Sequence, residues 1–511
     1  MITTENIKRR AASLKFIFSI WTLLGLIGTC FVSYFGAGLL ASNSPKWWYV
    51  SDWPGAQAPR EALFYFGIFL VCISWLIQAL RLAGDKIHIT HITSYFGKKF
   101  SSGSAMASGK SIGVVILLWS IPLVLGPSLF SQDMYSYLAQ GELWHLGYNP
   151  YSVAPITLGH LHQIALLRSV SPFWRKTTSP YGPLFIAISS FAFNIAGGNL
   201  QVAIILLRLV EVFGVALTAY GLDKLAQEFD VDRSLVRWVA IGSPLVLFDL
   251  ISAGHNDALM VALVVIAVWL ARNNKLALSF LLLAVAVTIK VPAVLPVYLL
   301  VICIIKTQAT FREKCLSALR YILIFTAMMA GLSIVLKTGL DWITTNIISA
   351  PGKVHLAITL STELGITLGD VLSKISPYLD ATHLEPFFAK VNVVAFILIL
   401  IRASFRVRWD NLVINLATLF ICSVILGPAT WPWYFSWGIV FVVLDKRFSS
   451  SAFFLISLVV VSVLVKPNGI LDIPSSYAPL VLALGLAAYL YGRRIYKPLD
   501  YEAVLESRIE L

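Results

Sequence analysis

Charged residues are scarce in this chain: Asp, Glu, Lys and Arg make up 13% of its 511 residues, against about 25% in a typical soluble protein. Hydrophobic residues make up 58%, and the mean hydropathy is +0.80. So few polar side chains cannot cover a water-facing surface, and most of the length must therefore lie in lipid. An ordinary soluble enzyme is excluded, and the sequence predicts a protein that crosses the membrane many times.

Cysteine is also rare and scattered. The chain has five cysteines, an odd number without a CxxC pair, which excludes a disulfide framework and a cysteine-based metal site. His160 and His162 have a spacing at which two histidines can share a metal, but no Asp, Glu or Cys stands nearby at ligand spacing, which favours a solvated loop. We expect no metal and no other cofactor.

Acidic residues are fewer than basic ones, 26 against 39, which gives a net charge of +13. No basic stretch is long enough to form a nucleic-acid-binding domain, so nucleic acid is not expected as a partner. In a membrane protein this excess is explained by basic residues on the cytoplasmic loops. Lys8, Arg9 and Arg10 precede an apolar run that is too long for a cleavable signal peptide, which predicts a first membrane helix with its amino end inside.

Apolar runs of about twenty residues predict the membrane crossings, and the basic residues between them set the orientation. The sequence predicts an all-α polytopic membrane protein with about fourteen transmembrane helices, each estimated from that length criterion, and with both termini in the cytoplasm. The runs cover residues 16–39, 63–82, 111–129, 201–222, 238–252, 258–271, a pair of short helices within 276–305, and then 321–336, 391–401, 412–426, 433–444, 453–465 and 480–491.

Two long segments, residues 130–200 and 337–390, are predicted on the extracytoplasmic side. Residues 183–196 within the first segment are apolar but short. As a full crossing they would place the basic residues of segment 224–237 outside, whereas a juxtamembrane or re-entrant helix places those residues inside. The sequence therefore favours a juxtamembrane helix in a long first working loop.

Polar residues gather at the outer ends of the predicted helices. An ionisable residue at membrane depth costs about 2.5 to 3.5 kcal/mol by insertion scales, so its presence there suggests a function. These residues are the segments 131–137, 179–183 and 255–257, together with Lys290 and the segment 431–434.

Each of these groups also has a purely structural explanation. Asp133 alone is equally well explained as an interfacial residue. Lys290 is long enough to extend to the headgroups, although Pro292 in a broken helix favours a binding site. The aromatic residues at 431–434 fit the aromatic belt of a membrane interface. The gathering of all of them on one side favours a functional site.

The chemistry that these residues suit is transfer of a sugar from a phosphate to a hydroxyl. The attacking hydroxyl needs a carboxylate to accept its proton, and Asp133 fits this role. The departing phosphate needs cations or hydrogen-bond donors, for which Arg175, Lys176, His255 and Lys290 are candidates. A single displacement inverts the anomeric carbon and needs one base instead of the two carboxylates of hydrolases.

At these residues the chain resembles a known family, the actinobacterial polyprenol-phosphate-mannose-dependent α-(1→6)-mannopyranosyltransferases of the MptB type, membrane enzymes of GT-C fold. The resemblance covers most of residues 111–444. It rests on the strings Ser131-Gln-Asp133-Met-Tyr135-Ser-Tyr137-Leu-Ala-Gln140-Gly141, Gly147-Tyr-Asn149-Pro150-Tyr151, Pro172-Phe-Trp174-Arg175-Lys-Thr177-Thr178-Ser-Pro180-Tyr181-Gly182-Pro183, Gly254-His255-Asn256-Asp257-Ala258-Leu259-Met260, Lys290-Val-Pro292 and Trp431-Pro-Trp433-Tyr434.

The resemblance implies a GT-C glycosyltransferase that takes mannose from polyprenyl-phosphate mannose. It further implies an acceptor that is a phosphatidylinositol mannoside or a growing α-(1→6)-mannan of lipomannan and lipoarabinomannan. The site would face outward across the plasma membrane. An amino-terminal module, residues 1–310, would carry the active-site loop 130–200, and a more variable carboxyl-terminal module, residues 311–511, would carry the outer loop 337–390.

The resemblance also implies roles for single residues. Asp133 would be the catalytic residue. Other members have a neutral residue where Lys176 stands, which favours Arg175 over Lys176 as a phosphate contact. The donor-phosphate contacts would be Lys290, Arg175 and His255, and the substrate contacts would be Tyr135, Tyr137, Gln140, Tyr181, Asn256, Asp257, Trp433 and Tyr434.

Two alternatives stay open at this stage. A GT-C enzyme of the same design could transfer arabinofuranose or another lipid-linked sugar. A transporter or flippase of lipid-linked sugars would also have many helices, but it would place its polar residues deep in the bundle and show internal symmetry. The polar residues here lie at one face, which favours the enzyme.

Overall fold

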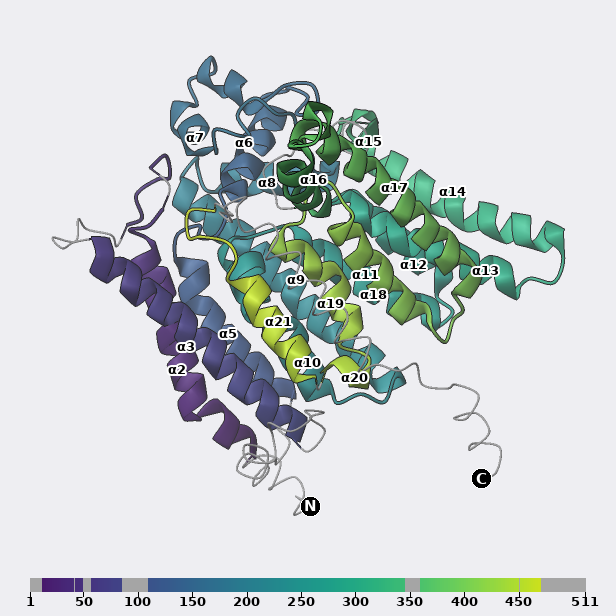
Figure 1. Ribbon diagram of the computed structural model, residues 1–511, viewed down its shortest axis with the longest axis horizontal. Helices are drawn as coiled ribbons and strands as arrows, with labels where there is room; N and C mark the ends of the chain where they lie inside the picture. Colours follow the sequence, from purple (N-terminus) through teal and green to yellow (C-terminus); the bar gives the residue numbers. More distant parts are fainter. Residues whose placement is uncertain are drawn as a thin grey trace.

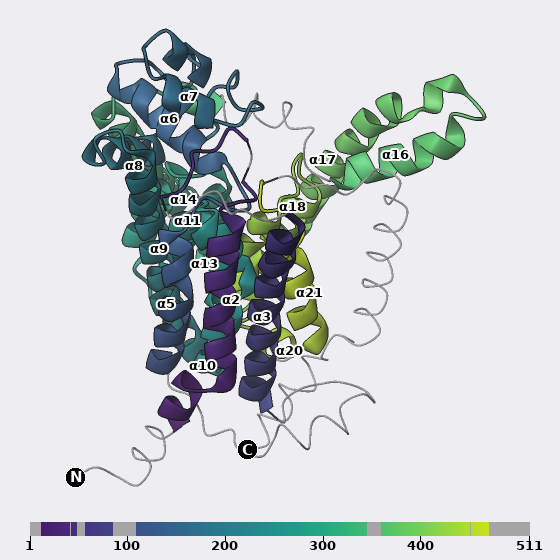
Figure 2. The same ribbon diagram turned by 90° about the vertical axis from the view of Figure 1, so that its left-hand side faces the viewer.

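The computed structural model of the protein describes residues 12–40, 42–48, 57–84, 109–344, 359–449 and 451–469. Over these residues every regular element is a helix, which confirms the all-α prediction for this part of the chain. Most of the long helices run side by side in a bundle (Figure 1). Shorter helices lie at one end of that bundle, which we call the loop end, and Figure 2 shows the same arrangement from the side.

Five helices in the described residues are long and apolar enough to cross a membrane, or six if one bent pair is counted as a span. Several others are apolar but shorter. The long ones are Ala12–Gly36, which contains α2 (Ile20–Gly36), α3 (Gln57–Ala83), α9 (Leu200–Glu228), α14 (Phe311–Val335) and α17 (Ala381–Arg406). The shorter ones are α5 (Gly109–Leu125), α8 (Pro183–Ile195), α12 (Leu276–Val287), Val291–Thr307, α18 (Leu412–Ile425) and α21 (Ala452–Ser462).

The predicted total of about fourteen crossings therefore stays a prediction. Helices of 10–17 residues are shorter than the roughly 20 residues that a straight span needs. The last predicted crossing, residues 480–491, lies outside the described residues.

The chain breaks within two apolar runs, of which only one break was predicted. The run 238–252 was expected as one helix, and this is wrong: α10 (Arg233–Ile241) ends before Pro244, and the chain continues as a π-helix, η3 (Val246–Ser252), bent by 58°. Pro244 lacks an N–H group and cannot continue the α-helical ladder. The break predicted at Lys290 is confirmed, because α12 ends at Val287 and η4 (Val291–Ala293) and α13 (Val294–Thr307) follow.

The first working loop forms a layer of short helices at the loop end (Figure 2). Its elements are α6 (Asp133–His145), η2 (Pro155–Gly159), α7 (Ile164–Ser169) and α8. Helix α8 packs closely on α6, since a Cβ atom on Gly141 would lie 2.4 Å from the backbone nitrogen of Ser190. The segment 183–196 thus forms a 13-residue helix packed on the loop layer.

The second outer segment, residues 337–390, was expected as a loop. Where the structure describes it, the segment is mostly helical: it contains α15 (Asp341–Thr344), α16 (Leu360–Leu372), η7 (Pro377–Leu379) and the first turns of α17. Helices α16 and α17 form a hairpin that projects from the bundle (Figure 2). Helix α17 begins at Ala381 instead of 391 because the side chain of Asp380 caps it, accepting a hydrogen bond from the N–H of His383.

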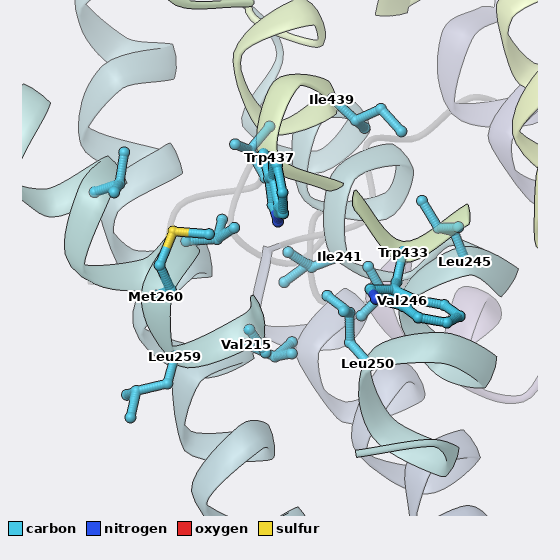
Figure 3. Packing of buried hydrophobic residues seen from close by; sticks show 14 of the residues in the cluster. Val215, Ile241, Leu245, Val246, Leu250, Leu259, Met260, Trp433, Trp437 and Ile439 are labelled. Carbon is cyan, nitrogen blue, oxygen red and sulfur yellow. The ribbon is translucent and has the colours of Figure 1, made fainter. Parts of the chain in front are cut away.

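The hydrophobic core runs through the bundle and continues into the layer of short helices at the loop end. Figure 3 shows side chains from α9, α10, η3 and α11 (Asp257–Arg272) packed with Trp433, Trp437 and Ile439 of the carboxyl-terminal half. Those three residues belong to η8 (Pro432–Phe435) and α19 (Ser436–Val442), which precede the short α20 (Lys446–Ser449). The two halves of the chain therefore share one core.

Candidate active site

Asp133 is the first residue of α6 and lies at the loop end. Its side chain is 17% exposed, so a ligand can reach the carboxylate. The backbone N–H of Asp133 donates to the Ser131 hydroxyl at 3.1 Å. The backbone at Phe130 has a φ of 66°, a left-handed conformation that is rare for a bulky side chain and often occurs at functional sites.

A turn from the carboxyl-terminal half holds the segment before Asp133. The N–H of Phe130 donates to the carbonyl oxygen of Pro467 at 3.0 Å. Gly469 has a φ of 84°, and a Cβ atom there would lie 3.0 Å from Cα of Ser131. Only glycine combines this backbone conformation with such a close approach. The turn 466–469 of the carboxyl-terminal half therefore fixes the start of α6.

His255 faces Asp133 from the turn between η3 and α11. Its Nδ1 lies 3.7 Å from Oδ2 of Asp133 and 3.3 Å from the Tyr137 hydroxyl oxygen. The imidazole is fully buried and stacks on Trp433 with 3.8 Å between ring centroids, and Trp433 stacks in turn on Trp431 at 4.8 Å. The aromatic residues that also fitted a membrane belt therefore form a stack that holds the imidazole in place.

Asp257 and Lys290 form a buried ion pair next to this stack. The Lys290 ammonium donates to both carboxylate oxygens, at 2.9 and 2.7 Å. The indole N–H of Trp437 also donates to Asp257, and the ring of Tyr434 lies 4.6 Å from the ammonium nitrogen. The structure therefore brings Lys290 to the site, with two of its three N–H donors directed to Asp257.

A third carboxylate, which the sequence alone did not indicate, lies near this pair. Glu211 of α9 is fully buried, and its Oε2 accepts a hydrogen bond from the N–H of Leu259 at 3.2 Å. Leu259 lies in the first turn of α11, where free backbone N–H groups favour an anion. Glu211 thus anchors the helix that carries Asp257.

The remaining predicted contacts surround the same region. Tyr137 packs edge-to-face against Tyr181 and Phe185, with centroid distances of 4.7 and 4.9 Å. Tyr135 and Gln140 are buried in α6. Among the described residues, Nε2 of His255 and the side-chain amide of Asn256 are buried without a hydrogen-bond partner, and buried groups of this kind are expected to bond to water or a ligand.

Arg175 is the predicted residue that the structure does not bring to the site. Its guanidinium donates to the carbonyl oxygens of Val170 at 3.0 Å and Arg168 at 2.8 Å, which closes its own loop. Lys176 is exposed. The neighbouring Trp174, which was not singled out, instead hydrogen-bonds to the carboxylate of Asp133.

Burial shifts the titration of both groups that face each other across the site. Burial raises the pKa of Asp133 to about 6, Lys290 and the hydrogen bonds from Trp174 and Ser131 oppose this rise, and Asp257 adds to it. Burial, assisted by Lys290, holds the pKa of His255 well below its usual value. At neutral pH the site therefore presents a carboxylate base beside an uncharged imidazole.

No group of three or more His, Cys, Asp or Glu side chains in the described ranges is arranged to hold a metal ion. His160 and His162 lie in the exposed turn that follows η2. The site can accept a proton at Asp133 and can offer N–H donors from Lys290 and His255 to an anion.

Comparison with known proteins places the chain in a class, the glycosyltransferases. Residues 22–306 match the alpha-(1->6)-mannopyranosyltransferase N-terminal domain of the MptA and MptB family, and residues 356–492 match the MptB C-terminal domain. The chain belongs to the family of α-(1→6)-mannopyranosyltransferases, as its resemblance predicted.

Individual relatives carry the same activity in their names. The chain is 30% identical to alpha-(1->6)-mannopyranosyltransferase A of Mycobacterium tuberculosis, over 73% of its own length and 69% of the relative's. It is 24% identical to alpha-(1->6)-mannopyranosyltransferase B of Corynebacterium glutamicum, over 82% of this chain and 71% of that one. No solved structure matches the chain significantly. The relatives support mannosyl transfer as the general activity.

Proposed function

We propose that this protein transfers mannose from polyprenyl-phosphate mannose to an α-(1→6)-mannan acceptor, with inversion, at the extracytoplasmic face of the plasma membrane. The observation that carries the proposal is the accessible carboxylate of Asp133, which lies beside buried His255 at the loop end of a membrane bundle. The acceptor would be a phosphatidylinositol mannoside or a longer mannan on the way to lipomannan and lipoarabinomannan.

In the proposed reaction Asp133 takes the proton of the acceptor hydroxyl while that oxygen bonds to the anomeric carbon of mannose. The bond between the anomeric carbon and the phosphate oxygen breaks, and the electron pair leaves with the polyprenyl phosphate. One carboxylate suffices for such a single displacement. The Asp133 carboxyl then returns its proton to water.

The departing donor phosphate needs cations or hydrogen-bond donors. We assign this role to the N–H of Lys290 that is not directed to Asp257 and to Nε2 of His255, which no described residue bonds. Arg175 is less suited, because two of its nitrogens bond to backbone carbonyls. The polyprenyl tail would stay in the bilayer, which is the partner of the whole bundle.

The charges at the opposite end of the bundle support an outward-facing site. Lys446 of α20 pairs at 2.9 Å with Asp230, between α9 and α10, and Arg272 at the end of α11 pairs at 2.8 Å with Glu228 at the end of α9. Helices α10 and α20 lie at the end of the bundle opposite α6 (Figure 1). Lys306 donates to backbone carbonyls at the end of α17. Basic residues at one end of a bundle mark its cytoplasmic side.

The decisive experiment incubates the purified, detergent-solubilised protein with radiolabelled polyprenyl-phosphate mannose and a synthetic α-(1→6)-dimannoside. An elongated product that an α-(1→6)-specific mannosidase cleaves supports the proposal. Elongation only with polyprenyl-phosphate arabinose would assign a different sugar. Movement of the labelled lipid across a proteoliposome membrane, without a product, would identify a flippase.

The rate of transfer should depend on pH through Asp133. The pKa of this carboxyl is raised to about 6, and only the ionised form accepts a proton. We therefore expect kcat/KM to be level above that value and to fall about tenfold per pH unit below it. A profile that stays level down to about pH 4, where an ordinary aspartate titrates, would remove Asp133 as the base.

The orientation is tested by labelling single cysteines in whole cells. In a background without the five native cysteines, Ser152→Cys at the loop end and Lys275→Cys in the turn after α11 both place the thiol at an exposed position. We expect a membrane-impermeant maleimide to label the first from outside and the second only after the cells are permeabilised. The reverse pattern would place the site in the cytoplasm.

A further inference from the structure

Arg208 lies in the middle of the apolar helix α9 and is fully buried. Its guanidinium bonds to backbone carbonyls of two separate segments. Nη1 donates to the carbonyl oxygens of Val124, at 3.1 Å, and Gly126, and Nη2 donates to that of Pro127 at 2.5 Å. Both Nε, at 3.0 Å, and Nη2 donate to the carbonyl oxygen of Ser252.

These carbonyls lie where the two site segments leave the bundle. Val124, Gly126 and Pro127 close the end of α5, six residues before Asp133, and Ser252 ends η3, three residues before His255. Carbonyls at the end of a helix lack intrahelical partners and attract a cation. Arg208 therefore joins the starting points of both segments.

The same face of α9 holds the other end of the His255 turn. Glu211 follows Arg208 by three residues and accepts the N–H of Leu259, beyond His255. Arg208 therefore holds the chain just before His255 and Glu211 holds it just after, and both side chains come from the same turn of helix α9. Gly254 completes the fit, because its φ is 70° and a Cβ there would lie 2.4 Å from Sδ of Met134, next to Asp133.

We propose that Arg208 is a positioning residue that sets the separation of Asp133 and His255 by clamping the carbonyls at the ends of α5 and η3. A guanidinium suits this role because its rigid fork of five N–H donors spans carbonyls that the compact ammonium of lysine cannot reach together. The kinetic part of the proposal rests on the proposed function, since it assumes that Asp133 is the base for mannosyl transfer.

The test compares Arg208→Lys with Arg237→Lys in the full-length protein. Arg237 is a matched control, because it bonds to Asp223 of the same helix α9 and to the carbonyl oxygen of Gly109 at the start of α5, at the end remote from the site. Misplacement of reacting groups by about 1 Å costs about a hundredfold in rate. We expect Arg208→Lys to lower kcat about ten- to a hundredfold with little change in the acceptor KM, and Arg237→Lys to lower kcat less than about threefold.

A second readout does not depend on activity. Hydrogen–deuterium exchange of both variants should show faster exchange in Arg208→Lys confined to peptides covering residues 127–133 and 252–257. Faster exchange throughout the bundle would mean that Arg208 only supports the fold in general, and would overturn the proposal. A lowered kcat without any change in exchange would also overturn it, as would faster local exchange with a normal kcat. If the wild-type protein transfers no mannose, the proposed function fails, and the exchange pattern alone decides whether the clamp exists.

Discussion

Asp133→Asn should abolish mannosyl transfer while the protein stays folded and inserted in the membrane. The amide keeps the size of the carboxylate and can accept the same hydrogen bonds from Trp174 and Ser131, but it cannot take a proton from the acceptor hydroxyl. Loss of a general base costs about 10² to 10⁴ in rate. The measurement is the initial rate with labelled polyprenyl-phosphate mannose, with donor and acceptor both saturating.

Asp230→Asn is the matched control, because Asp230 is a nearly fully exposed carboxylate at the opposite end of the bundle, where it pairs with Lys446. It should keep its rate within about twofold, since exposed ion pairs contribute about 1 kcal/mol or less to stability. Asp133→Asn at more than about a tenth of the wild-type rate would remove Asp133 from the mechanism.

The same substitution should not lower stability. Burial raises the pKa of Asp133 in the folded protein to about 6, above the ordinary value of about 3.9, so the ionised carboxylate weakens the fold at neutral pH. This penalty shrinks as the pH falls from about 6 and is gone below about 4, where the carboxyl is protonated in both states. The neutral amide removes the penalty at every pH. We expect a melting temperature equal to or higher than that of the wild type, which separates loss of chemistry from loss of fold.

Lys290→Met should destabilise the protein strongly. It leaves the fully buried carboxylate of Asp257 with the indole N–H of Trp437 but without its cation. Breaking a buried pair by removing one partner costs about 3 to 5 kcal/mol. Thermal unfolding in detergent should show a large fall in melting temperature, whereas Lys446→Met, which breaks the exposed pair with Asp230, should change it little.

The double variant Lys290→Met with Asp257→Asn separates the structural role of Lys290 from its proposed role at the donor phosphate. Because it removes both charges and keeps an acceptor for Trp437, it should recover most of the lost stability. A charge-assisted contact to phosphate contributes about 1.5 to 3 kcal/mol. The donor KM of the folded double variant should therefore be roughly ten- to a hundredfold higher than that of the wild type. A normal donor KM in a stable double variant would place the phosphate elsewhere.

The sequence predicted the placing of the site residues better than their contacts. Hydropathy and charge placed Asp133, His255 and Lys290 at helix ends on one side. In the structure His255 lies beside Asp133, and Lys290 lies against Tyr434, next to the Trp433 ring on which His255 stacks. Charge also selected Arg175, whose guanidinium donates to carbonyl oxygens of its own loop in the structure. The contact of Trp174 with Asp133 could not be predicted, because one aromatic residue among several in the same loop does not stand out in the sequence.

Two further features were beyond the reach of sequence reasoning for physical reasons. Arg208 lies in a run read as an ordinary crossing, and its partners are backbone carbonyls, which every residue has and which no pattern of side chains reveals. The π-helical break at 246–252 depends on packing as well as on Pro244. By contrast, the capping side chain of Asp380 stands in the sequence and gives the true start of α17.

The turn 466–469 couples the evolution of the two halves of the chain, because it lies in one half and contacts the other. Pro467 and Gly469 hold the segment before Asp133, and Trp433 and Tyr434 contact His255 and Lys290. Both halves of the chain therefore form the candidate site. A recombinant that joined the first half of one relative to the second half of another would pair the Asp133 segment of one protein with the turn of the other. Substitutions in the carboxyl-terminal half that move this turn or Trp433 will therefore also move Asp133 or His255, and we expect the two halves to change together.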